Sequence, residues 1–143
     1  MELVVRTVRE EPPGRRPVEV VERKGIGHPD TICDGVAEAV TRDLSRHYQE
    51  RFGHVLHHNV DKVLLFGGAS RPAFGGGEVC EPIEIYLAGR ATRSLRGVEV
   101  PVNDLADAAV RGWLREHLHA LDPEAHVKLH CLVRPVSGEL AEL

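Results

Sequence analysis

Hydrophobic and polar positions along the chain predict two amphipathic helices set among short strands. Over 30–51, apolar side chains recur every three or four residues, which places them on one face of a helix that begins at Asp30 or Thr31. A second helix is expected over 103–120, because Asn103 can cap its start and Asp122-Pro123 stops it. Strands rich in β-branched or alternating apolar residues are expected at 18–22, 57–66, 83–88, 98–102 and 127–133.

The order of these elements suggests a fold class. With 98–102 set aside as a short extra strand, the order is strand, helix, strand, strand, helix, strand. This is the order of the split β-α-β-β-α-β unit, an α+β arrangement in which helices cover one face of a sheet. The glycine- and proline-rich segments 11–17 and 67–77 and the polar tail 134–143 are expected to be loops.

Composition narrows the function classes. The 143 residues are 42% hydrophobic and 28% charged, as in a globular domain, and the net charge of −4 offers no basic excess for a nucleic acid. Cys33, Cys80 and Cys131 are widely spaced and form no CxxC pair, so neither a disulfide framework nor a zinc site is expected. The sequence shows no signal-peptide core and no membrane-spanning run. We therefore expect a cytoplasmic protein with no membrane partner.

The segment 25–35, GIGHPDTICDG, carries the candidate chemistry. Glycines let the backbone turn from a strand into a helix that starts at His28-Pro29-Asp30. The free N–H groups and positive dipole end of a helix N-terminus suit phosphate oxygens. His28 can hydrogen-bond a phosphate or a leaving oxygen, and Asp30 offers the carboxylate oxygen that magnesium prefers. Glu22 and Asp34 are further acidic candidates.

An ordinary helix start accounts for the same residues. Proline in the first turn and aspartate near the cap are common helix-start choices, and the glycine pattern does not complete a GxGxxG motif. The residues alone leave both interpretations open.

Four separate blocks carry a family resemblance. They are VERKGIGHPDTICDGVAEAV (21–40), LHHNVDKVLLFGG (56–68), FGGGEVCEPIEI (74–85) and GRAT (89–92). In this order they resemble the archaeal-type methionine adenosyltransferases, also called S-adenosylmethionine synthetases. The resemblance covers the chain from about Val18 onward.

The resemblance implies a reaction and a set of site residues. In this family the sulfur of L-methionine attacks C5′ of ATP and displaces triphosphate, which is hydrolysed to phosphate and pyrophosphate, with Mg²⁺ and K⁺ as cofactors. By position His28 would lie beside the leaving oxygen, Asp30 would bind Mg²⁺, and Glu22 would line the nucleotide site. Asp61 matches an acidic residue near the K⁺ site. Family members form their active sites between two subunits, so a homodimer is expected.

Three other features receive no role. Arg90 stands in GRAT where bacterial relatives place a glutamate that contacts methionine, and no function is assigned to it. His57 and His58 are adjacent on an expected strand, where side chains point to opposite faces, which disfavours a metal pair. The glycines of 67–77 lie between strands instead of opening a helix, which favours a surface connection over a phosphate cradle.

The resemblance also implies that the chain is one part of a three-domain enzyme. We expect an N-terminal segment and loop over 1–17, the first domain over 18–134, and the truncated start of an active-site loop over 135–143. The remaining domains would then come in cis, as in a full enzyme of which this is a fragment, or in trans, as in a split enzyme. The third possibility is a non-catalytic relic that binds a nucleotide or another protein. The chain alone is expected to lack synthetase activity.

Overall fold

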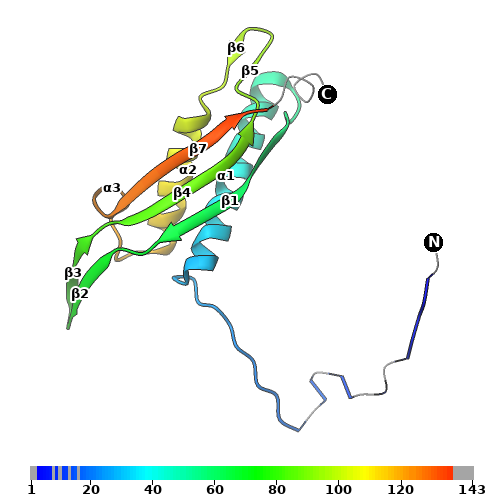
Figure 1. Ribbon diagram of the computed structural model, residues 1–143, viewed down its shortest axis with the longest axis vertical. Helices are drawn as coiled ribbons and strands as arrows, with labels where there is room; N and C mark the ends of the chain where they lie inside the picture. The colour runs from blue at the N-terminus through cyan, green and yellow to red at the C-terminus, as the bar shows by residue number, and fades with distance from the viewer. Residues whose placement is uncertain (1–2, 8, 10, 13, 16, 137–143) are drawn as a thin grey trace.

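A computed structural model describes residues 3–136 of the chain except 8, 10, 13 and 16. The described residues before Pro29 form an exposed, extended segment that leads away from the folded part (Figure 1). The folded part is a small sheet with helices on one face. Among the described residues, no helix is long and apolar enough to cross a membrane.

The sheet has three strands in the order β1-β4-β7. Its strands are β1 (His58–Phe66), β4 (Ile83–Ala91) and β7 (Val127–Pro135). β1 pairs antiparallel with β4, and β7 pairs parallel with β4. Because parallel neighbours need a crossover connection, the chain between β4 and β7 passes through the helix α2 (Val102–His117) on one face of the sheet (Figure 1).

Two helices cover that face, and smaller elements connect the strands. The two helices are α1 (Pro29–Phe52) and α2 (Val102–His117), and the short α3 (Pro123–His126) leads into β7. The remaining strands form two hairpins, β2 (Ala69–Ala73) with β3 (Gly76–Glu81), and β5 (Ser94–Leu95) with β6 (Val98–Glu99).

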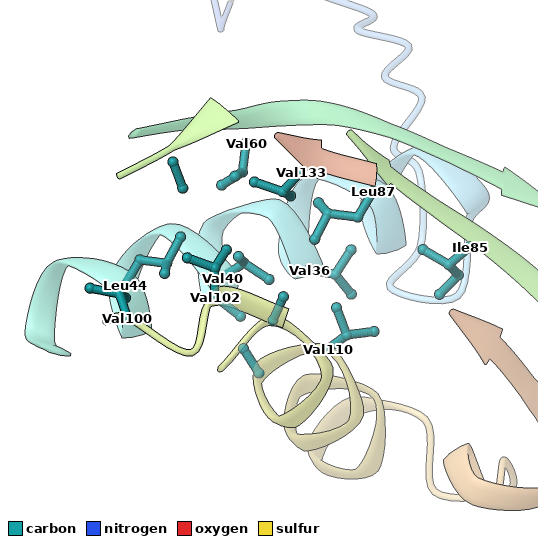
Figure 2. Close-up of a cluster of buried hydrophobic side chains, with 14 of the residues drawn as sticks. Val36, Val40, Leu44, Val60, Ile85, Leu87, Val100, Val102, Val110 and Val133 are labelled. Carbon is teal, nitrogen blue, oxygen red and sulfur yellow. The ribbon is translucent and has the colours of Figure 1, made fainter. Parts of the chain in front are cut away.

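The hydrophobic core lies between the sheet and the two long helices. Figure 2 shows aliphatic side chains from α1, α2 and the three strands meeting there, among them Val36, Val40, Leu44, Val60, Ile85, Leu87, Val110 and Val133. Each fully buried valine or leucine of this kind contributes roughly 1.5–3 kcal/mol. Because so few aromatic residues are available, aliphatic packing holds the helix start in place.

Local sequence sets the ends of α1. His28 is its N-cap, Pro29 occupies the first turn, and Gly53 ends the helix with a left-handed φ of 80°. Along its length, Gly35 lets α2 approach closely, since a Cβ at this position would lie 2.3 Å from the ring of Trp113. The candidate site therefore lies at the start of a helix that is fixed at both ends and along its buried face.

The mixed α+β class and most elements agree with the sequence prediction, and several details do not. No strand forms over 18–22. The segment 67–77, expected to be a loop, is largely part of the β2–β3 hairpin, whose two-residue turn is closed by Gly75 at φ 78°. The expected strand 98–102 shrinks to β6, and α2 ends at His117, before the predicted residue 120.

The split β-α-β-β-α-β unit is not confirmed. In that unit the first strand, here 18–22, would lie parallel beside the third, which corresponds to β4. In the structure β7 occupies this place, so 18–22 has no position inside the sheet. The prediction that 135–143 begins an active-site loop falls largely on 137–143, outside the described residues.

Candidate functional site

His28 and Asp30 lie together at the start of α1. The ring nitrogen Nδ1 of His28 accepts a hydrogen bond from the backbone N–H of Asp30, with 3.1 Å between the nitrogens. A neutral imidazole has one donor and one acceptor nitrogen, so an accepting Nδ1 leaves the proton on Nε2. The helix cap therefore makes Nε2 of this exposed side chain a hydrogen-bond donor.

Asp30 is charged and paired. Its Oδ2 forms an ion pair and hydrogen bond with Nζ of Lys24, six residues earlier. The hydrogen bond from Lys24 and its positive charge hold the pKa of the Asp30 carboxyl below its usual value. The carboxylate is therefore ionised at neutral pH and available to a cation.

The helix start fits a magnesium ion only as a partial site. Mg²⁺ commonly takes one or two protein carboxylates and fills its other positions with phosphate and water oxygens. Asp30 supplies one exposed carboxylate, and Asp34, one turn later, is also exposed. Within the described residues, no three His, Cys, Asp or Glu side chains gather into a metal site of their own. The donor set thus fits an ion whose remaining ligands come from elsewhere.

Glu22 is not held near His28. It lies in the extended segment that leads into the helix, with its side chain exposed. In the described part of the chain nothing fixes its position relative to the helix start.

Asp61 lies in a different region. It lies on β1 beside a bulge, and its Oδ2 is 2.7 Å from Nζ of Lys62, whose hydrogen bond lowers the pKa of the Asp61 carboxyl. Together with His57, Asn59, Gly89 and Arg90 it lines a shallow cavity of about 260 Å³.

The two regions lie toward opposite ends of β1. The start of α1 adjoins the end of that strand, since Ile32 and Leu65 line the same cavity. Asp61 lies several residues earlier on β1, and Gly89 at the bulge approaches so closely that a Cβ would lie 2.1 Å from the carbonyl oxygen of Asn59. The structure therefore joins His28 to Asp30 but does not bring Asp61 to them.

An apolar cavity adjoins the helix start. It has a volume of about 340 Å³, and Gly27 and Pro29, the two neighbours of His28 in sequence, contribute to its wall. Ile32, Leu65, Ile83 and Leu121 form most of the rest, together with the root of the β2–β3 hairpin. Its lining suits an apolar group rather than a phosphate.

The residues without an assigned role have structural partners. Arg90 donates from Nη1 to the carbonyl oxygen of Pro135 at 2.9 Å, which ties the ends of β4 and β7 together. His58 contacts the carbonyl oxygen of Leu56 through Nδ1 at 2.8 Å and the hydroxyl of Ser45 through Nε2 at 3.3 Å.

Two features of the structure were missed by sequence reasoning. One is Lys24, whose approach to Asp30 depends on how the glycine turn folds. The other is a cluster on the sheet face that the helices leave open, where Tyr86 Oη and His130 Nε2 lie 2.8 and 2.9 Å from the same oxygen of Glu84. The two rings stack at 4.3 Å, and both hydrogen bonds lower the pKa of the Glu84 carboxyl. Only the strand register shows that these residues meet, because His130 is 46 positions from Glu84.

Comparison with known proteins identifies close relatives. The family model for S-adenosylmethionine synthetase (AdoMet synthetase) matches residues 1–143. The chain is 50% identical over 141 residues to a probable S-adenosylmethionine synthase of Aquifex aeolicus, covering 99% of the chain and 35% of that protein. It is 60% identical over 114 residues to the S-adenosylmethionine synthase of Aeropyrum pernix (77% and 28%), and 48% identical over 142 residues to that of Pyrobaculum neutrophilum (96% and 35%). The chain thus spans about a third of the length of these relatives.

Proposed function

The chain belongs to the S-adenosylmethionine synthetase family, and we propose that it supplies the His28–Asp30 part of a methionine adenosyltransferase active site. Such an enzyme joins L-methionine to ATP, forms S-adenosylmethionine and releases phosphate and pyrophosphate. The observation that carries the proposal is the cap at the start of α1. The same hydrogen bond that begins the helix aims an N–H donor outward, beside an ionised carboxylate.

His28 is proposed to stabilise the leaving group. When the methionine sulfur attacks C5′, negative charge grows on the triphosphate oxygen that leaves. A fixed donor such as Nε2–H lowers the energy of that charge most in the transition state, where the charge is greatest. The free backbone N–H groups at the start of α1 act in the same direction.

Asp30 is proposed to hold magnesium against the polyphosphate. A bound Mg²⁺ supplies positive charge that offsets the charge of the triphosphate. In the structure Lys24 forms an ion pair with the Asp30 carboxylate. When a metal cation binds this carboxylate instead, the Lys24 ammonium can turn to a phosphate oxygen. Lys24 is therefore part of the proposed site as a mobile positive charge.

Glu22 and Asp61 are proposed for the nucleotide and K⁺ sites. Asp61 lies toward the other end of β1 from the start of α1. We therefore expect Asp61 to serve a different active site from His28 and Asp30. A homodimer can meet this geometry, because His28 and Asp30 of one subunit can then face Asp61 of the other. Other parts of the enzyme, in cis or in trans, are proposed to supply the remaining residues that bind the triphosphate.

A calorimetric titration tests the proposal on this chain. Magnesium triphosphate should bind the wild-type chain, and both His28→Ala and Asp30→Asn should weaken the binding. Asp43→Asn, which removes a half-buried carboxylate further along α1, is the matched control and should leave binding unchanged. Binding that is indifferent to His28 and Asp30 would remove them from the site. Binding that depends on them, without turnover in any complete enzyme, would favour the relic alternative, a nucleotide-binding module.

A further inference from the structure

Two arginines lie side by side on the face of the sheet that the helices leave open. Arg90 of β4 and Arg134 of β7 are register partners in the parallel pair, and both are exposed. Their neighbours Ala91 and Val133 are buried in the core, so the alternation of side chains along a strand directs both arginines to the opposite face. Because neighbouring strands are roughly 4.8 Å apart, the two guanidinium groups can reach the same small ligand.

Neither arginine has an acidic partner. In the part of the chain that the structure describes, neither Arg90 nor Arg134 forms an ion pair. Nη1 of Arg90 donates to the carbonyl oxygen of Pro135 at 2.9 Å, a contact that leaves the positive charge unbalanced. A guanidinium group has five N–H donors in one plane, so most of the donors of Arg90 are still available.

Two acidic side chains of the same sheet have other partners. Oδ2 of Asp61 lies 2.7 Å from Nζ of Lys62, and Glu84 is hydrogen-bonded to Tyr86 and His130. The chain as a whole carries a net charge of −4, so two unbalanced arginines side by side do not follow from its composition. Because like charges this close repel one another, an anion between them would stabilise the arrangement.

The chemistry of the pair determines the class of ligand. A guanidinium group donates two parallel hydrogen bonds to one oxyanion, and two such groups side by side can bind it from two directions. We propose that Arg90 and Arg134 form an oxyanion site on the open face of the sheet, and that its ligand is the carboxylate or phosphate group of a small molecule.

A cavity beside Arg90 leaves room for the rest of that molecule. Arg90 lines the shallow cavity of about 260 Å³ that also includes Asn59 and Asp61. A ligand whose oxyanion lies between the two arginines can therefore place its remaining atoms in this cavity. L-Methionine carries a carboxylate and ATP carries phosphates, so the choice between these two ligands rests on the proposed function, whereas the site itself does not.

An NMR titration of the chain tests the site. The Nε–H resonances of Arg90 and Arg134 are followed while L-methionine or inorganic phosphate is added. We expect one of these probes to shift both resonances, and Arg90→Gln and Arg134→Gln each to raise its dissociation constant about tenfold or more. Arg115→Gln, which removes an exposed arginine of α2, is the matched control and should leave the dissociation constant unchanged.

Every outcome of this titration bears on the site. A response to L-methionine identifies the oxyanion as a carboxylate, and a response to inorganic phosphate identifies it as a phosphate. No shift with either probe, or an equal loss of binding in Arg115→Gln, would overturn the proposal. Arg134→Gln is the decisive variant if Arg90→Gln disturbs the end of β7, because Arg134 makes no hydrogen bond or ion pair in the described structure. Failure of this site would leave the proposal for His28 and Asp30 standing, since none of these variants changes either residue.

Discussion

Nδ1 of His28 and the backbone N–H of Asp30 form a 3.1 Å hydrogen bond that both begins α1 and determines which ring nitrogen is the donor. The same hydrogen bond therefore stabilises the helix start and provides the donor for the proposed chemistry. A shorter capping side chain, which has no N–H at the position of Nε2, separates the two roles.

His28→Ser should keep the fold and lose catalysis in a complete methionine adenosyltransferase that contains this chain. Serine is a good N-cap, so the stability of α1 is retained, whereas the outward Nε2–H donor is lost. Removing one donor to a developing oxyanion typically lowers kcat by about 100- to 1,000-fold. His28→Ala should lower kcat equally and also cost about 1 kcal/mol of stability. Steady-state kinetics of both variants measure the effect on kcat, and urea unfolding measures the effect on stability. An unchanged kcat in His28→Ser would rule out the donor role of His28.

Lys24→Gln should raise the pKa of the Asp30 carboxyl. The hydrogen bond and charge of Lys24 are the main causes that lower this pKa, so their removal returns it toward the usual aspartate value. A lowered folded-state pKa contributes stability above the ordinary pKa of aspartate, and this contribution is lost as pH falls through the folded value. NMR titration of the carboxyl carbon measures the shift. Lys62→Gln is the control, since it should move the pKa of Asp61 upward and leave Asp30 unchanged.

Two glycines on facing helices should respond oppositely to alanine. Gly35→Ala places a methyl group 2.3 Å from the Trp113 ring and should destabilise the domain by about 1–3 kcal/mol, because α1 and α2 must move apart. Gly112→Ala meets no atom within 4 Å and should stabilise α2 by about 0.5–1 kcal/mol. Urea unfolding of both variants measures the difference. Equal effects would mean that the helices are not in the close contact described.

Tyr48→Phe should change both stability and its dependence on alkaline pH. The buried hydroxyl donates to the carbonyl oxygen of Thr92 at 2.7 Å, and loss of this hydrogen bond should cost about 1 kcal/mol at neutral pH. Burial raises the pKa of Tyr48 from 10 to about 12. A raised pKa contributes stability that is complete below pH 10 and lost as pH rises toward 12. The variant should therefore lose less stability over this range than the wild type, measured by denaturant midpoints at pH 8 and pH 11.

Local signals made α1 and its candidate residues predictable from the sequence. The helix was expected over 30–51 and spans Pro29–Phe52, because the caps and the apolar periodicity lie within the segment itself. His28 and Asp30 are two residues apart, so their proximity follows from any helix start. Their roles in binding and catalysis remain predictions.

Pairing between distant segments explains what could not be predicted. The segment 18–22 has the composition of a strand but pairs with none of the described strands, and β7 takes the place beside β4 that the expected topology gives to 18–22. The β2–β3 hairpin was missed because its glycines indicate a loop as readily as a turn. Asp61 is separated from His28 because α1 and β1 run antiparallel. No pattern within either segment predicts this relative orientation.

The most direct test of whether His28 donates to a polyphosphate through Nε2 follows its ring nitrogens by ¹⁵N NMR while magnesium triphosphate is added to the chain. We expect the Nε2 resonance to move, Nδ1 to keep the chemical shift of a capping acceptor, and Asp30→Asn to abolish the response. A ring that does not respond, or a response at Nδ1 with release of the cap, would contradict this donor role.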